Sequence, residues 1–105
     1  MTVSAINTFR LRPGVSAADF ERFSRDLDRS VCLAFDVVLD FDVYLSDDSP
    51  ANVVEVMTVT SWPEWEEVRD GAPELRAVVQ RFGELVELDS VTTVLTRKSP
   101  LKQEI

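Results

Sequence analysis

Four segments of the chain alternate apolar with polar side chains, or carry runs of β-branched residues between turn signals. Both patterns are typical of β-strands, because successive side chains of a strand point to opposite faces of a sheet. The predicted strands are Val3–Leu11, Val37–Leu45, Asn52–Thr60 and Ser90–Arg97. A polar cluster at residues 46–50 separates the second strand from the third and predicts a hairpin there.

Between the first two strands the apolar residues recur every three or four positions, which predicts an amphipathic helix at Ala17–Ser30. Ser16 stands three residues before Asp19, as in a capping box. The stripe expected to face the core is Phe20, Phe23, Leu27 and Val31, and the outer face carries Glu21, Arg22, Arg25, Asp26 and Arg29. We interpret that charged face as an ordinary solvated surface.

A second helical region follows the hairpin. Ser61 and Glu64 repeat the capping pattern before a helix that opens at Trp62. The sequence Asp-Gly-Ala-Pro at residues 70–73 interrupts this helix, and a further helical stretch, Pro73–Leu85, places Leu75, Val78, Val79 and Phe82 on one face. The helices and strands therefore predict a single domain at residues 1–97, followed by a flexible tail at 98–105.

The order β-α-β-β-α-β predicts an α+β, ferredoxin-like fold, in which both helical crossovers lie on one face of a four-stranded antiparallel sheet. The other face should then be polar in a monomer. Instead, the strands carry apolar pairs that point to both faces: Val37-Val38-Leu39, Val53-Val54, Val56-Met57 and Val94-Leu95. We therefore predict a homodimer in which two helix-free faces pack together; the alternative is a monomer with a loosely apolar surface.

The second strand assigns its residues to the two faces by strict alternation. One side receives Val37, Leu39, Phe41, Val43 and Leu45, and the other receives Val38, Asp40, Asp42 and Tyr44.

Composition narrows the possible functions. The 105 residues carry a net charge of −8, which disfavours nucleic acid and anionic membrane surfaces as partners. The chain shows neither a membrane-spanning apolar run nor the layout of a signal peptide, so we expect a cytoplasmic protein. It contains no histidine, which removes the usual general base and the commonest metal ligand. Its one cysteine, Cys32, lies in an apolar run and is interpreted as an inert, buried side chain.

Glu55 is the first candidate for chemistry, because a carboxylate is unusual between Val54 and Val56 in the middle of a strand. In such a place its charge must be paired or its pKa raised, and a carboxyl group with a raised pKa can act as a general acid or base near neutral pH. The alternative is a structural ion pair with Arg10 or Arg97.

Other candidates could bind a substrate. Asp40, Asp42 and Tyr44 share one face of the second strand, where they could contact a polar substrate edge or simply protect an exposed sheet edge. Polar groups of the first strand, Asn7 and Arg10, could orient a carbonyl or carboxylate. Flat indole rings that could wall a pocket for an aromatic substrate, or serve only as core, are Trp62 and Trp65.

Several short motifs resemble the RedY-like proteins of the dimeric α+β barrel superfamily, over residues 3–97. The motifs are Phe9-Arg10-Leu11-Arg12-Pro13-Gly14-Val15, Asp19-Phe20-Glu21, Phe41-Asp42-Val43-Tyr44, Val54-Glu55-Val56 and Leu95-Thr96. The resemblance implies a small tailoring enzyme from a biosynthetic cluster for pyrrole- or indole-derived natural products. Some relatives carry histidine at the position of Tyr44, so a mechanism that needs imidazole there could not run unchanged. Tyrosine could still donate a hydrogen bond or a proton.

These observations lead to one main hypothesis and two alternatives. The main hypothesis is an enzyme with no metal or organic cofactor that binds a planar aromatic molecule between sheet and helices. Glu55, helped by Tyr44, would transfer protons during cyclisation, condensation or dehydration. The first alternative is a cofactor-free monooxygenase, which the wider superfamily includes. The second is a non-catalytic module that binds or chaperones an intermediate or a partner enzyme.

Overall fold

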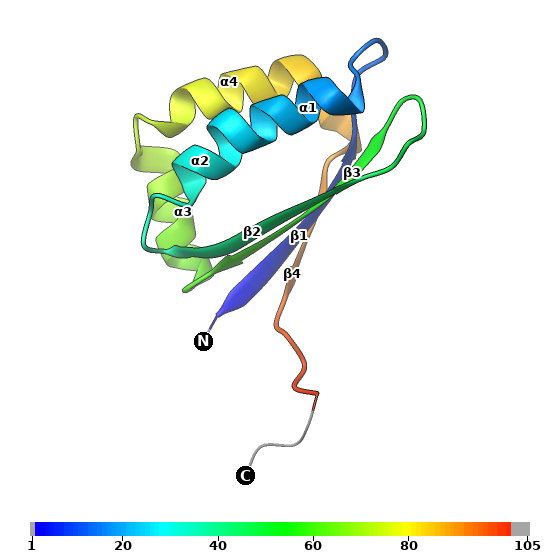
Figure 1. Ribbon diagram of the computed structural model, residues 1–105. Helices are drawn as coiled ribbons and strands as arrows, with labels where there is room; N and C mark the ends of the chain where they lie inside the picture. Colours follow the sequence, from blue (N-terminus) through cyan, green and yellow to red (C-terminus); the bar gives the residue numbers. More distant parts are fainter. Residues whose placement is uncertain (1, 102–105) are drawn as a thin grey trace.

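The computed structural model describes residues 2–101, and it contains the predicted four-stranded antiparallel sheet (Figure 1). The strands lie side by side in the order β2-β3-β1-β4, which is the ferredoxin-like arrangement. Their bounds are β1 Val3–Arg10, β2 Val38–Leu45, β3 Asn52–Val59 and β4 Thr92–Thr96. Each lies within one or two residues of the predicted segment. Part of the expected tail, residues 102–105, lies outside the described residues, and 98–101 contain no helix or strand.

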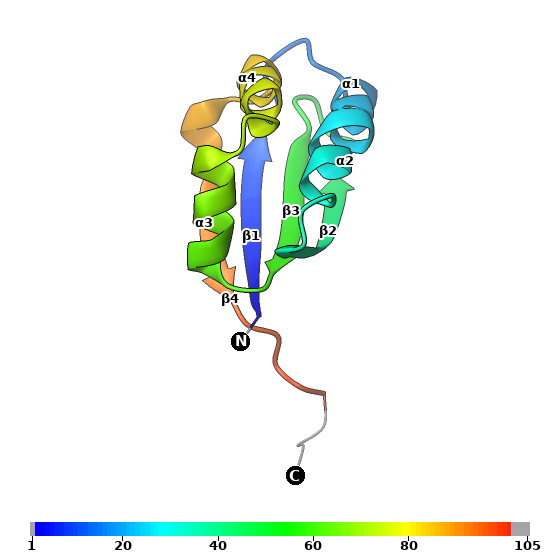
Figure 2. The same ribbon diagram turned by 90° about the vertical axis from the view of Figure 1, so that its left-hand side faces the viewer.

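All the longer helices cover the same face of the sheet (Figures 1 and 2). The helical elements are α1 Ala17–Phe23, the π-helical segment η1 Ser24–Asp28, α2 Arg29–Cys32, α3 Trp62–Gly71, α4 Leu75–Leu85 and the 3-10 turn η2 Leu88–Ser90. Figure 2 shows α1 and α2 over one half of the sheet and α3 and α4 over the other. The β-α-β-β-α-β prediction is therefore confirmed.

Local capping explains where the two helical crossovers begin. The Ser16 hydroxyl accepts a hydrogen bond of 3.0 Å from the Asp19 amide, and the Asp19 carboxylate accepts one of 3.2 Å from the Ser16 amide. The Ser61 hydroxyl likewise accepts from the Glu64 amide at 3.3 Å. Each cap satisfies amide groups that the first helical turn leaves without an intrahelical partner.

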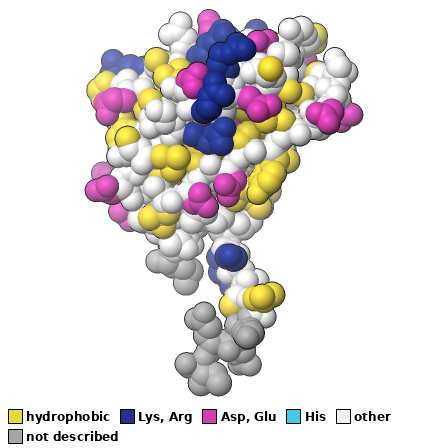
Figure 3. Space-filling view, in the orientation of Figure 1, with side chains coloured by type: hydrophobic (Ala, Val, Ile, Leu, Met, Phe, Trp, Pro, Cys, Tyr) yellow, Lys and Arg dark blue, Asp and Glu magenta, His cyan; other side chains and the backbone are white. Residues whose placement is uncertain are grey.

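The first crossover is helical throughout, but it is not a uniform α-helix as predicted. The Arg29 amide donates to the Ser24 carbonyl, five residues earlier, so the helix winds more widely over Ser24–Asp28. The charged side chains on its outer face pair locally, as between Arg25 and Asp26 at 2.8 Å. In Figure 3, basic side chains form a dark blue stripe across the helical layer.

The expected alternation along the second strand is wrong at its start. Val38 pairs with Val59 and Asp40 pairs with Thr58, so Leu39 is an extra residue that forms a β-bulge. Val38 is consequently buried in the core, whereas Leu39 is 52% exposed. From Asp40 onward the predicted alternation holds.

The core lies between the sheet and the helices. Four phenylalanines meet there in edge-on or tilted contacts, with ring centroids 5.0 Å apart for Phe9 and Phe82 and 5.6 Å apart for Phe9 and Phe20. Phe20 is fully buried, and Phe23 also contacts it. Within residues 2–101, each helix is too short or too polar to cross a lipid bilayer.

Candidate functional site

A cavity of about 370 Å³ lies between the sheet and the helical layer. Its walls are mostly apolar, and aromatic rings from the strands and helices supply much of their surface: Phe9, Phe41, Trp62, Trp65 and Phe82. Such a concave, largely apolar site with a few polar groups is typical of small-molecule binding sites. The polar side chains that line it come from β1, β3, β4, α3 and the first helical crossover.

Glu55 lies at the centre of β3 and lines this cavity. Its strand neighbours are Asn7 on β1 and Val43 on β2. The residue is only 4% exposed, and its Oε2 atom has no hydrogen-bond partner among the described residues. Burial, reinforced by the negative charge of Asp28, raises the pKa of Glu55 to about 8, although the Arg29 guanidinium opposes the shift. The carboxyl group is therefore protonated at neutral pH.

Asp28 is the second carboxyl group in the cavity wall. It is 7% exposed and ends the π-helical segment. Burial raises its pKa to about 6, against the opposing effects of the Cys32 hydrogen bond and the Arg29 charge. At neutral pH the two buried carboxyl groups therefore share about one proton, and the larger upward shift makes Glu55 the more readily protonated of the two. This places an acid and a base in one apolar cavity.

Cys32 is buried, as the sequence predicts, and its thiol donates to Asp28 Oδ1 over 3.5 Å. Burial and the neighbouring Asp28 charge raise the pKa of the thiol. It is therefore no nucleophile at neutral pH. The thiol instead serves as a hydrogen-bond donor to one oxygen of the Asp28 carboxylate.

The other cavity walls offer hydrogen bonding and aromatic contact. Asn7 Oδ1 accepts a hydrogen bond of 2.6 Å from Thr93 Oγ1, which leaves the amide NH2 group as its donor. The indoles of Trp62 and Trp65 come from α3. The Arg69 guanidinium carbon lies 6.0 Å from the centroid of the Trp62 ring. The cavity thus brings together Glu55 and three of the predicted binding residues.

The remaining predicted residues lie on the other face of the sheet. Tyr44 pairs with Val54, whereas Glu55 pairs with Val43, so the two side chains point to opposite faces. The expectation that Tyr44 lies beside Glu55 within one protomer is therefore corrected, and the second carboxyl group that lines the cavity with Glu55 is Asp28. Asp40 and Asp42 share the face of Tyr44, opposite Thr58 and Val56.

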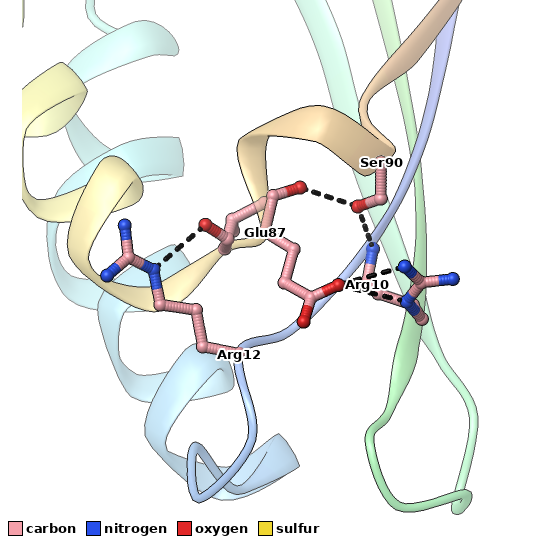
Figure 4. Close-up of polar contacts among 5 residues, drawn as sticks. Arg10, Arg12, Glu87 and Ser90 are labelled. Carbon is pink, nitrogen blue, oxygen red and sulfur yellow. Dashed lines mark hydrogen bonds and ion pairs between the residues drawn. The ribbon is translucent and has the colours of Figure 1, made fainter.

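Arg10 is also remote from Glu55. Figure 4 shows its guanidinium turned toward Glu87, with an ion pair of 2.9 Å. Its amide donates to Ser90 Oγ at 2.8 Å, and neighbouring Arg12 donates to the Val86 carbonyl at 3.2 Å. Neither Arg10 nor Arg97 forms an ion pair with Glu55, so the structural ion pair considered as the alternative for Glu55 is not present in residues 2–101.

Asp28 was not among the predicted site residues. The signal for it in the sequence is spacing, because Asp28 stands four residues before Cys32, which lies in an apolar run. An acidic residue at that spacing lies on the inner face of a helix. In residues 2–101, no cluster of three or more acidic, histidine or cysteine side chains could hold a metal ion.

Comparison with known proteins identifies the family. The sequence matches the family described as REDY-like protein HapK over residues 3–98. The chain belongs to this family. The resemblance seen in its short motifs is therefore confirmed, and the REDY-like assignment covers every helix and strand of the fold. Among curated proteins, no sequence matches the chain.

Solved structures similar to this REDY-like protein share its fold. HapK from Hahella chejuensis is 19% identical, with a TM-score of 0.77 over 100% of this chain and 99% of that chain. SnoaB, a cofactor-independent oxygenase from Streptomyces nogalater, is 14% identical, with a TM-score of 0.78 over 97% and 98%. A dimeric protein of unknown function and ferredoxin-like fold from Bacteroides fragilis is 17% identical, with a TM-score of 0.69 over 92% and 96%. These identities establish the fold alone.

Proposed function

We propose that this protein is a tailoring enzyme of secondary metabolism that acts, without a bound cofactor, on a planar aromatic intermediate derived from indole or pyrrole. The reaction would be a cyclisation, condensation or dehydration in the cavity between sheet and helices. One observation carries the proposal: two buried carboxyl groups, Asp28 and a Glu55 whose Oε2 atom has no partner among the described residues, line the same largely apolar cavity. Membership of the REDY-like family supports the same class of function.

The two carboxyl groups suit paired acid and base catalysis. In a dehydration, Asp28 would remove a proton from the substrate while Glu55 donates its proton to the departing hydroxyl, which leaves as water. Proton return from Asp28 to Glu55 through solvent would reset the pair. Such general acid and base steps each contribute about 10²–10⁴-fold in rate. The aromatic walls would orient the flat substrate and exclude water.

The test is incubation of the purified protein with candidate bis-indole or bipyrrole intermediates, followed by product analysis. We expect an altered product profile with the native protein and a loss of about 10²–10⁴-fold in rate for Glu55→Gln. The matched control is Glu84→Gln, since Glu84 is an exposed residue of α4 that pairs with Arg81. An unchanged profile in Glu55→Gln would contradict the assignment, and so would ligand binding that raises the melting temperature without any turnover.

The pH profile gives a second readout of the same assignment. Because the base must be ionised and the acid protonated, the rate should rise as pH passes about 6 and fall as pH passes about 8. A rate that is constant from pH 5 to 9 would argue against this pair.

A second candidate activity is cofactor-free oxygenation, which is favoured by the structural similarity to SnoaB, a cofactor-independent oxygenase. Here Asp28 would deprotonate a phenolic substrate, and the resulting anion would itself reduce O2. Oxygen consumption with a quinol-like substrate distinguishes this activity from the first. If the product forms at full rate under anaerobic conditions, oxygenation is excluded.

We also propose that the enzyme is a homodimer in which the helix-free sheet faces pack together. Ile6, Val54 and Val56 lie on that face and are only half-buried within one protomer, and Val94 is 57% exposed. A second copy would cover these apolar side chains. The description of the similar Bacteroides fragilis protein as dimeric supports the proposal.

A further inference from the structure

The cavity combines aromatic walls with an acidic interior, and this combination bears on which ligands bind as well as on proton transfer. An apolar cavity that only had to hold a neutral aromatic ring would need no second buried carboxyl group. Buried acidic groups cost free energy unless a ligand or a neighbour compensates them. Protonation removes this cost for Glu55, and a ligand of opposite charge would remove it for both carboxylates. The groups that face Glu55 show whether the protein itself supplies that charge.

Few positive charges reach Glu55 from the elements packed against it. The first crossover contributes Asp28, Arg29 and the Cys32 thiol, and α3 contributes Arg69 at the cavity wall. The cavity residues of α4 are apolar, and Asn7 and Val43, its neighbours on β1 and β2, carry no charge.

Both arginines already have partners. Arg29 Nε donates to Ser24 Oγ at 3.0 Å. Arg69 pairs with Asp70 at 3.0 Å and with Glu66 at 3.5 Å. Neither guanidinium is therefore committed to the Glu55 carboxyl group, whose Oε2 atom remains without a hydrogen-bond donor in the described residues.

The aromatic walls favour positive charge as well. An aromatic face attracts a cation within about 6 Å of its centroid. Trp62 already holds a cation in this way, since the Arg69 guanidinium lies at that distance over its ring. The net charge of −8 would also draw cations toward the molecule.

Resting on the proposed function, we infer that the cavity selects a flat, nitrogen-containing aromatic molecule that carries a delocalised positive charge, stacked against the α3 indoles with its charge facing Glu55 and Asp28. The unpartnered Oε2 atom would be the main contact for that charge. A neutral aromatic molecule of the same shape would fill the cavity without satisfying the two carboxyl groups. Charge, in addition to shape, would thus determine which substrates or intermediates bind.

Cation binding should release a proton. Glu55 is protonated at pH 7, because its pKa is raised to about 8. A bound positive charge favours the ionised carboxylate, lowers the pKa of Glu55 and expels its proton to solvent. A neutral ligand gives no such displacement. Proton release therefore reports the charge interaction separately from binding itself.

The experiment is titration calorimetry at pH 7 in two buffers with different ionisation enthalpies. The probes are N-methylquinolinium, a permanent flat cation, and 1-methylnaphthalene, its neutral counterpart of similar shape. We expect the cation to bind about 10-fold more tightly than the neutral probe, a preference typical of a desolvated cation–π and carboxylate site, and to release up to one proton per site. Equal binding of the two probes, or cation binding without proton release, would overturn the inference.

Two variants locate the effect. Glu55→Gln should abolish proton release and most of the cation preference, while its affinity for 1-methylnaphthalene stays within about 2-fold, which also shows that the cavity is intact. Trp62→Leu should reduce the cation preference by about 5-fold. Glu84→Gln should behave as the native protein. Retention of the cation preference in Glu55→Gln would contradict the inference. Because these are binding measurements, their outcome is independent of whether the proposed reaction is observed.

Discussion

The two faces of the sheet break the expected pattern of side chains in opposite ways. On the helix-covered face, β3 buries Val53, Met57 and Val59 but places Glu55 among them. On the helix-free face, the same strand turns Val54 and Val56 toward a surface that no helix covers (Figures 1 and 2). The helix-covered face therefore carries a polar group among apolar side chains. The helix-free face carries apolar side chains where a polar surface is expected.

The two departures have different physical consequences. A carboxyl group among core side chains costs free energy in the folded chain, and the compensation comes from a raised pKa, which is useful for chemistry. Valines on the helix-free face cost little free energy in a single folded chain. They stabilise the protein only when another surface covers them. The first departure concerns the cavity, and the second concerns association.

The largest expected effect is on the covered face. Phe20→Ala removes a fully buried ring that contacts Phe9 and Phe23, so the free energy of unfolding should fall by about 3–5 kcal/mol. Denaturant unfolding measures this. The control is Tyr44→Ala on the other face, where the side chain is 62% exposed and the loss within one protomer should stay below about 1 kcal/mol. Equal losses of unfolding free energy in the two variants would contradict the conclusion that the core lies on the helix-covered face.

The next effect is on association. Val56→Asp places a charge at the middle of the helix-free face, opposite Ile6 and Asp42. Burial of that charge in a dimer, beside another carboxylate, should weaken dimerisation by about 100-fold or more. Light scattering across a concentration series measures it. A native protein that is monomeric at high concentration would refute the proposed dimer, whatever the variant does.

A further effect is expected at Glu55, on the pH dependence of the free energy of unfolding. Its pKa is about 8 in the folded state and near its ordinary value of 4.5 in the unfolded chain, so folding takes up a proton between these pH values. The contribution of Glu55 to stability is therefore complete below about pH 4.5 and is lost as pH rises to about 8. Glu55→Gln should lack this decline, so the variant should be more stable than the native protein at pH 9. Parallel thermal melts across pH test it, and identical pH dependence would contradict it.

The smallest effect is expected at Arg10. Arg10→Gln breaks an ion pair with Glu87 in which the arginine side chain is 52% exposed, so stability should change by about 1 kcal/mol or less. Binding of 1-methylnaphthalene in the cavity should be unchanged, because Arg10 lies on the other face. If affinity for that probe fell in this variant, the assignment of Arg10 outside the site would be wrong.

Much of the fold could be predicted because it depends on local signals. Ser16 and Ser61 mark the starts of the two crossovers, and the polar cluster after Leu45 marks the hairpin. Glu55 could be singled out for a similar reason, since a lone carboxylate among valines is visible without a structure. These features are fixed by neighbours in the sequence.

The rest depends on contacts between distant segments. The β-bulge at Leu39 is set by the register of β2 against β3, which strict alternation does not reveal. Periodicity alone does not fix which face of one strand matches which face of the next, so the sequence does not show that Tyr44 and Glu55 point to opposite faces. Asp28 was missed because its orientation depends on the winding of a helix far from Glu55 in the chain.

The wide turn at Ser24–Asp28 has a consequence for how this site could be altered. In an α-helix each residue advances by about 100° around the helix axis. A turn that contains one added residue therefore changes the direction in which the later side chains point. Deleting one residue from this turn, before Asp28, would change the direction of Asp28 and Cys32 together relative to the cavity. The strands would be untouched. A change in the length of this one helix could thus alter the acidity of the cavity without a change in the sheet.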